Sequence, residues 1–180
     1  IFLKDLEQLG FKTENLFGVD ISEKAIENCK KNGIQNSFVM DAQNISLTEK
    51  FDLIIASDCL EHLENDTIAI QNWKQLLKNN GLLYLFVPAF QSLWSEHDEV
   101  NQHFRRYSKN ELTTKLLDAK FVILKSSYWN FSLFIPVYMF RKISTILPKS
   151  KKEEGQIVGN KLINTLLLHL VLIENKLLSF

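Results

Sequence analysis

Four short apolar runs, separated by segments with helical spacing, restrict the fold of this chain most. The runs are LFGV (16–19), SFVM (37–40), LIIA (53–56) and LLYLFV (82–87). They are nearly continuous rather than alternating, as in strands of a parallel sheet that is covered on both faces. Strand and helix alternate from about residue 1 to residue 131, which predicts an α/β fold with right-handed crossovers.

Local signals predict where the helices begin and end. Ser22 is placed to cap the first crossover helix and Gly33 to end it, and SKNE (108–111) has the spacing of a capping box. The next crossover helix is predicted to end at Gly81 and to bury five residues, Ala69, Ile70, Trp73, Leu76 and Leu77. The segment KFVILKSSYWN (120–130) is predicted to be a further strand.

Composition excludes some classes of partner. The chain has 180 residues, with 21 basic and 21 acidic side chains and a formal net charge of zero. One domain is expected, and a general attraction to nucleic acid or to an anionic membrane is not indicated. Cys29 and Cys59 form no CxxC pair, so we expect no metal site. With no signal peptide recognisable at Ile1, we expect reduced thiols in a cytoplasmic protein.

Two of the apolar runs end on an acid. Asp20 follows the first run and Asp41 follows the second. In doubly wound folds an acid at this place hydrogen-bonds a ribose, because a carboxylate can accept from two vicinal hydroxyls. Two such acids at neighbouring strand ends can hold one nucleoside. The alternative is a pair of solvated loop acids.

The ordered set of motifs resembles a known family. After the two acids come FDLIIASDCLEHL and then LLKNNGLLYLFVP. This order and spacing, over about residues 1–131, resemble the class I S-adenosylmethionine-dependent methyltransferases of the small-molecule type. The resemblance implies a Rossmann-like, doubly wound and mostly parallel sheet. It also implies S-adenosyl-L-methionine as cofactor and methyl transfer to a small-molecule or lipid-like acceptor.

The resemblance implies a cofactor site made of residues that follow three strands: Asp20, Ile21, Asp41, Ala42, Ser57 and Asp58. Asp20 corresponds to the ribose-binding acid, and Ile21 to the apolar contact with the adenine. Asp41 corresponds to the acid near the adenine amine, with Ala42 supplying backbone. The last two residues lie where the family's fourth strand opens under the methionine moiety.

A polar loop, WSEHDEVNQHFRRYS (94–108), follows the last of the four runs. Its candidate substrate-binding residues are Trp94, His97, Asp98, Arg106 and Tyr107. The candidate catalytic residues are His62, at the family's frequent EH position, and His103. A His–Asp pair can act as a general base, and arginine can hold an anionic substrate. The alternatives are a loop that these residues tie to the sheet and a His62 that packs a helix.

The chain also departs from the family pattern. The glycine-rich turn is absent, since Gly10 and Gly18 do not supply it, and Lys120 replaces a common glycine. We expect a sheet that lacks its first strand with that loop, and its last strand, as in a fragment trimmed at both ends. Residues 1–10 are then the helix after the missing turn.

The C-terminal residues, 132–180, are predicted to be an apolar helical segment of the same domain as 1–131. The apolar stretches 131–147 and 156–180 are interrupted too often to span a bilayer. They are expected to cover the sheet. A lid over a hydrophobic substrate and a peripheral membrane contact are the alternatives.

Two other functions remain open. YMFRK (138–142) has the Tyr-xxx-Lys spacing of short-chain NAD(P)-dependent oxidoreductases. That family's Asn-Ala-Gly after the fourth strand is missing, which disfavours it. A non-catalytic protein with a methyltransferase-like fold is the other alternative, because a fold does not guarantee activity.

Overall fold

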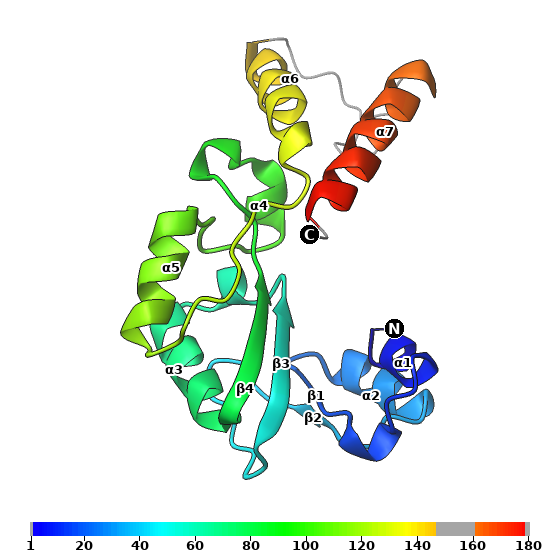
Figure 1. Cartoon of the computed structure of the whole chain (residues 1–180), viewed down its shortest axis with the longest axis vertical. Helices are drawn as coiled ribbons and strands as arrows, with labels where there is room; N and C mark the ends of the chain where they lie inside the picture. Colours follow the sequence, from blue (N-terminus) through cyan, green and yellow to red (C-terminus); the bar gives the residue numbers. More distant parts are fainter. Residues whose placement is uncertain (1, 147–160, 179–180) are drawn as a thin grey trace. The chain divides into compact units, whose positions relative to one another are not determined.

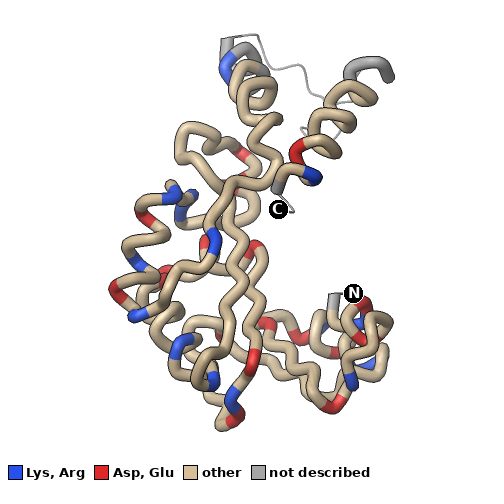
Figure 2. Tube along the Cα trace, viewed as in Figure 1, with Lys and Arg blue, Asp and Glu red and all other residues tan. Residues whose placement is uncertain are grey.

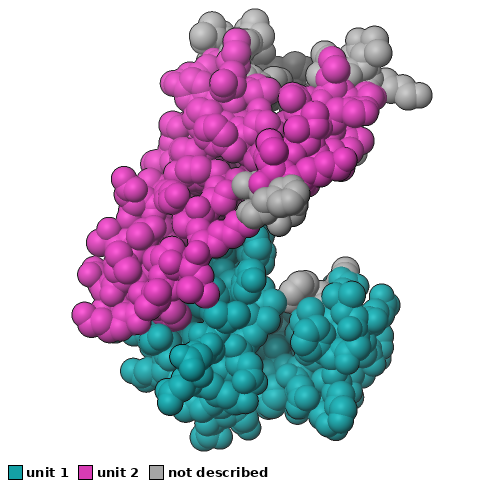
Figure 3. Space-filling model, viewed as in Figure 1, with its two compact units in different colours: residues 1–86 teal, residues 87–180 magenta. Residues whose placement is uncertain are grey.

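The computed structural model describes residues 2–146 and 161–178. The chain divides into two compact units, residues 1–86 and residues 87–180 (Figure 3). The predicted boundary between an α/β part, residues 1–131, and an apolar helical segment, residues 132–180, stays a prediction.

Unit 1, residues 1–86, is an α/β unit with two pairs of parallel strands (Figure 1). Its strands are β1 (Gly18–Asp20), β2 (Ser37–Val39), β3 (Phe51–Ser57) and β4 (Leu77–Phe86). β1 pairs with β2 and β3 pairs with β4. Its helices are α1 (Phe2–Gln8), α2 (Glu23–Lys31), α3 (Asp66–Leu76) and the 3-10 turns η1 (Thr13–Asn15) and η2 (Leu60–His62).

The strand order agrees with one part of a doubly wound sheet. In the order 3-2-1-4-5, β1 and β2 take the places of strands 2 and 3, while β3 and β4 take those of strands 4 and 5. The described residues provide no strand between β1 and β3, so the two pairs form separate sheets instead of one. Phe17, just before β1, packs edge-on against Phe51 of β3 at 5.1 Å.

The predicted helix boundaries are confirmed where a side chain caps the helix. The Ala25 N–H donates to Ser22 Oγ (3.3 Å) at the start of α2. Gly33, with φ of +90°, lies two residues after α2 ends. Residues 2–8 form α1, within the helix predicted for residues 1–10.

The predicted end of α3 at Gly81 is wrong. The helix stops at Leu76, and β4 begins at the next residue. Asn80 takes the left-handed conformation (φ 65°). Gly81 has another role: a Cβ there would lie 2.9 Å from the Phe51 carbonyl oxygen. The glycine therefore permits the close approach of β4 to β3.

The core of unit 1 forms around α3. The five residues predicted to be buried are buried: Ala69, Ile70, Trp73, Leu76 and Leu77. The Trp73 ring is 2% exposed and its Nε1 donates to the Ala42 carbonyl (2.8 Å). This bond ties α3 to the turn after β2.

Unit 2, residues 87–180, is helical in its described part (Figure 1). Its elements are η3 (Gln91–Leu93), α4 (Glu96–Val100), α5 (Lys109–Asp118), η4 (Phe131–Leu133), α6 (Phe134–Ile146) and α7 (Lys161–Leu178). Ser108 caps α5 as predicted, since its Oγ accepts the Glu111 N–H (3.2 Å). The apolar C-terminal stretches are helical where they are described.

The strand predicted for residues 120–130 is wrong. These residues are irregular, and Val122 and Leu124 are 79% and 77% exposed. A strand needs a neighbour to satisfy its backbone, and an isolated parallel bridge, Ala89 with Tyr107, is the β pairing found among the described residues of unit 2. Lys120, where the family commonly has glycine, has φ of 63°.

Trp73→Phe tests the bond between α3 and the turn after β2. We expect it to lower the free energy of unfolding by about 1–3 kcal/mol, because the part-buried Ala42 carbonyl loses its donor. Urea unfolding followed by circular dichroism measures the change. Tyr84→Phe, at a 53% exposed ring of the same unit, is the control and should change little. Equal effects of both variants would contradict a stabilising role for the bond from Trp73 to the Ala42 carbonyl.

Candidate functional site

The predicted cofactor acids lie at adjacent carboxyl ends of the β1–β2 pair. Asp20 is the last residue of β1 and is in register with Val39, and the Met40 N–H donates to the Asp20 carbonyl (3.1 Å). Asp41 follows directly. Both carboxylates are exposed. The parallel pairing therefore brings two acceptor groups from separate loops to one edge.

Each of these carboxylates is held by its own loop. The Ser22 N–H donates to Asp20 Oδ1 (2.7 Å), and the Gln43 N–H donates to Asp41 Oδ1 (2.8 Å). Both bonds join an aspartate to the N–H two residues later, the geometry of an Asx turn. One oxygen of each group is thus fixed in direction, and the second keeps its full acceptor capacity for hydroxyl or amino groups.

Cys59 lies two residues after the end of β3, and acids from three loops act on its thiol. Burial, and to a lesser extent the charges of Glu61, Asp20 and Asp41, together raise the pKa of its thiol to about 11. The thiolate is disfavoured because three carboxylates act on a half-buried group. Neither Cys59 nor the fully buried Glu61 was predicted to belong to this site. Their place in the sequence, just after the predicted strand that leads into Ser57 and Asp58, could have indicated both.

Ser57 and Asp58 form the carboxyl end of β3. Ser57 Oγ donates to Asp58 Oδ2 (3.0 Å), and the Asp58 N–H donates to the Phe86 carbonyl at the end of β4 (3.1 Å). Asp58 has φ of 48°, a left-handed conformation that costs about 1 kcal/mol in a non-glycine residue. An open hollow beside it is lined by Ile55, Ser57, Tyr84 and Phe86.

The other two predicted cofactor residues differ in what they can offer. Ile21 is 78% exposed, so its side chain is accessible to an aromatic ring. The Ala42 carbonyl already accepts from Trp73, so its backbone N–H is the group left for a ligand. His62, the first catalytic candidate, is exposed in η2.

In unit 2, Asp98 is the centre of the polar loop. It is fully buried, and Arg106 donates to it twice, from Nε to Oδ1 (2.7 Å) and from Nη2 to Oδ2 (3.0 Å). His103 Nδ1 lies 2.9 Å from Oδ1, and the Ser95 N–H donates to Oδ2 (2.9 Å). Arg106 Nη1 also donates to the Ala89 carbonyl (3.1 Å).

These bonds keep Asp98 ionised. Burial by itself raises the pKa of the carboxyl, but the hydrogen bonds from Arg106, His103 and Ser95 outweigh burial and lower the pKa to about 2. An ionised carboxylate can only accept, so Nδ1 of His103 must carry a proton. In a neutral imidazole Nε2 then carries the lone pair. A neutral His103 would therefore be the tautomer that accepts a proton at Nε2.

The structure brings together three of the loop residues singled out in the sequence, Asp98, His103 and Arg106. Tyr107 is buried, and its backbone pairs with residues 88 to 90. Trp94 is half-buried. His97 is exposed and its Nε2 contacts Asn101 Nδ2 (2.9 Å), away from the Asp98 cluster.

Titration of Cys59 tests the gathering of acids. In a Cys29→Ala background, the ultraviolet absorbance of the thiolate should rise with a midpoint near pH 11. Asp20→Asn combined with Asp41→Asn should lower the midpoint, because two nearby negative charges are removed. Asp52→Asn, at the amino end of β3, is the matched control. A midpoint that the double variant leaves unchanged would place the acids away from the thiol.

Acid unfolding tests the Asp98 cluster. A carboxyl whose pKa is lower in the folded protein stabilises it above its unfolded pKa. This contribution is lost as the pH falls through the folded pKa. Asp98 should therefore contribute about 2 kcal/mol that disappears between about pH 4 and pH 2.

The difference in stability between the native protein and Asp98→Asn, measured by urea unfolding, should shrink over that interval. Asp118→Asn at the exposed end of α5 should follow the native profile. A constant difference for Asp98→Asn would show that its carboxyl is not ionised in the cluster.

Comparison with known proteins agrees with this geometry. Residues 1–85 match a family described as "Methyltransferase domain". A ubiquinone biosynthesis O-methyltransferase of Haemophilus ducreyi is 29% identical over 79 residues, 38% of this chain. The match spans about a third (34%) of that relative's length.

Solved structures share the fold at low identity. The YcgJ protein from Bacillus subtilis has a TM-score of 0.53 at 16% identity, covering 75% of this chain and 68% of its own. A putative methyltransferase from Bacillus halodurans has the same TM-score and identity, covering 77% and 74%. The [4+2]-cyclase SpnF has a TM-score of 0.52 at 19% identity, covering 72% and 52%. With its parallel strands, the chain thus has a Rossmann-like fold, and its residues 1–85 are similar to the methyltransferase domain family.

Proposed function

We propose that the protein transfers a methyl group from S-adenosyl-L-methionine to a small-molecule or lipid-like acceptor. The observation that carries the proposal is the pair of exposed carboxylates, Asp20 and Asp41, each oriented by an Asx-type bond at adjacent ends of β1 and β2. Two oriented acceptors at neighbouring parallel strand ends fit the hydroxyl and amino groups of one nucleoside.

The residues present fit this cofactor. Asp20 would accept from the ribose hydroxyls, Ile21 would contact the adenine face, and Asp41 would accept from the adenine amine. Ala42 would offer its N–H, since Trp73 occupies its carbonyl. The bound cofactor supplies an activated methyl group, so the protein's task is mainly to align the acceptor and exclude water. Ser57 and Asp58 are our candidates for the methionine end.

Where the acceptor must lose a proton, the base we propose is His103. Its Nδ1 lies 2.9 Å from the ionised Asp98, so a neutral imidazole would accept a proton at Nε2. Asp98 and Arg106 are buried in their mutual contacts and would position the loop, whereas Trp94 and His97 are more accessible. The relative whose name includes ubiquinone biosynthesis is in keeping with a lipid-like acceptor.

Two alternatives are less well supported. The Tyr-xxx-Lys pair of an oxidoreductase falls in α6, where the Lys142 ammonium lies 5.7 Å from the Tyr138 ring centroid, and that ring stacks on Phe134. These contacts suit a packing role. The name of SpnF, a cyclase, illustrates that this fold also serves other reactions. Whether the protein is a scaffold that binds no cofactor is therefore tested by the titration below.

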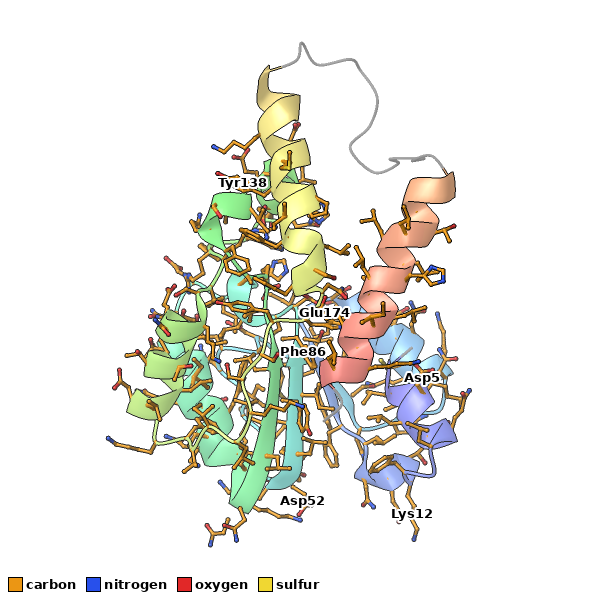
Figure 4. All side chains as sticks on the ribbon, turned by 45° about the horizontal axis from the view of Figure 1, so that its top comes forward. Asp5, Lys12, Asp52, Phe86, Tyr138 and Glu174 are labelled. Carbon is orange, nitrogen blue, oxygen red and sulfur yellow. The ribbon has the colours of Figure 1, made fainter. Side chains whose placement is uncertain are left out.

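Calorimetric titration of S-adenosylhomocysteine into the protein is the decisive measurement. We expect binding that Asp20→Ala weakens tenfold or more, about 1.4 kcal/mol, because the ribose loses its acceptor. Asp52→Ala removes an exposed aspartate at the other end of β3, paired with Lys78 (2.8 Å), and should bind normally. Its place is labelled in Figure 4.

Binding equally reduced by both variants, or absent throughout, would contradict the cofactor assignment. A parallel titration with NAD and NADP then distinguishes an oxidoreductase from a scaffold. The cytoplasmic location stays a prediction.

A further inference from the structure

Helix α7 presents a continuous row of large apolar side chains to solvent. Leu166, Leu170, Ile173 and Leu177 recur at helical spacing, so they share one side of α7, and each is between 46% and 71% exposed. We call these four residues the α7 stripe. In α6, Ile135 and Met139 are similarly placed one turn apart and are 66% and 56% exposed.

The exposure of the α7 stripe does not come from an undocked helix. Another side of α7 is packed, since Leu167, Val171 and Glu174 are half-buried. Glu174 accepts the backbone N–H groups of Phe131 (2.6 Å) and Ser132 (2.9 Å), and also the Ser132 hydroxyl (2.5 Å). These bonds fix α7 to the segment before α6. Glu174, which belongs to α7, is labelled in Figure 4.

The electrostatics of Glu174 strengthen this attachment. Burial raises the pKa of its carboxyl, but the hydrogen bonds from the Ser132 side chain and backbone and from Phe131 outweigh it and hold the pKa below its usual value. Trp129 Nε1 also donates to Asn175 Oδ1 (2.9 Å). The orientation of α7 in unit 2 is therefore set, and the α7 stripe remains outside the packed side.

Charge is distributed unevenly around these helices. Residues 131–146 and 161–178 contain four basic residues, Arg141, Lys142, Lys161 and Lys176, and one acid, Glu174. That acid is engaged in the internal bonds just described. Residues 1–130 instead contain 14 basic and 18 acidic side chains. Figure 2 shows the acidic positions distributed mainly over the earlier elements. An apolar exposed surface thus coincides with the cationic part of a neutral chain.

We propose that α6 and the α7 stripe dock on the surface of a membrane that contains anionic lipid. An amphipathic surface of this kind places its apolar side chains at the boundary of the acyl chains and its lysines among the headgroups. Trp129 is 66% exposed beside the anchor of α7, and tryptophan favours the interface. No helix among the described residues is long and apolar enough to cross a bilayer. The contact that we propose is peripheral.

Other occupants fit the surface less well. A second copy of the chain would bring two surfaces of the same positive sign together, which opposes association. The core of a protein interface is generally depleted in lysine, whereas a phosphate-rich headgroup layer attracts it. The inference goes beyond methyl transfer and does not depend on it.

Vesicle flotation with the whole chain tests the proposal. The protein should float with vesicles of phosphatidylcholine and phosphatidylglycerol and much less with phosphatidylcholine alone. Leu170→Glu with Ile173→Glu should weaken binding at least tenfold, because charged groups replace the α7 stripe. The matched control is Val100→Glu with Leu117→Glu, at residues of unit 2 that are 74% and 51% exposed on α4 and α5. It should bind normally.

Lys142→Gln with Lys176→Gln should reduce binding to the anionic vesicles and its sensitivity to salt. Circular dichroism verifies that each variant keeps its helix content. The proposal is overturned by an absence of flotation, by equal loss in the stripe and control variants, or by indifference to anionic lipid. It is also overturned if sedimentation velocity shows a dimer that the stripe variants dissociate, with no vesicle binding.

Discussion

Parallel pairing is the constraint on which the candidate site depends. A parallel connection must carry the chain back along a helix before the next strand begins, and α2 and α3 do so for β1–β2 and β3–β4. The carboxyl ends of paired strands consequently share an edge. Asp20 and Asp41 lie at this edge although 20 residues of chain separate them. The charges of both contribute to the raised pKa of Cys59, the thiol two residues after the end of β3.

The polar loop of unit 2 is organised differently, by a charge rather than by a sheet. Asp98 replaces the water around its carboxylate with donors from Arg106, His103 and Ser95. A buried carboxylate is stable only when it is paired and hydrogen-bonded. The same bonds place the Nδ1 proton of His103 toward Asp98, so the loop's stability and the tautomer of a neutral His103 have one cause. Substitutions in this cluster would therefore affect both together.

Sequence reasoning succeeded where the determinants are local. Ser22 and Ser108 cap the helices they were predicted to cap, because a cap depends on three or four consecutive residues. The paired acids could be predicted because strand ends can be recognised along the chain. It failed where a distant partner decides: residues 120–130 have strand-like composition, but the described part of the chain offers them no neighbouring strand. Likewise, the buried contacts of Asp98 depend on chain reversals that no local motif specifies.

The proposed membrane contact rests on local charge rather than on net charge. A formal charge of zero argued against attraction to an anionic membrane, yet electrostatic attraction acts over about 10 Å at ordinary ionic strength, so the local charge governs it. In this chain the cationic excess lies with α6 and α7, while the acids lie mainly in earlier elements. The sequence contains this charge asymmetry, but the membrane proposal also needs the exposure of the α7 stripe, which only the structure provides. A methyltransferase that acts on a lipid-like acceptor gains from such a surface, because a peripheral enzyme meets its substrate within the membrane plane rather than from dilute solution.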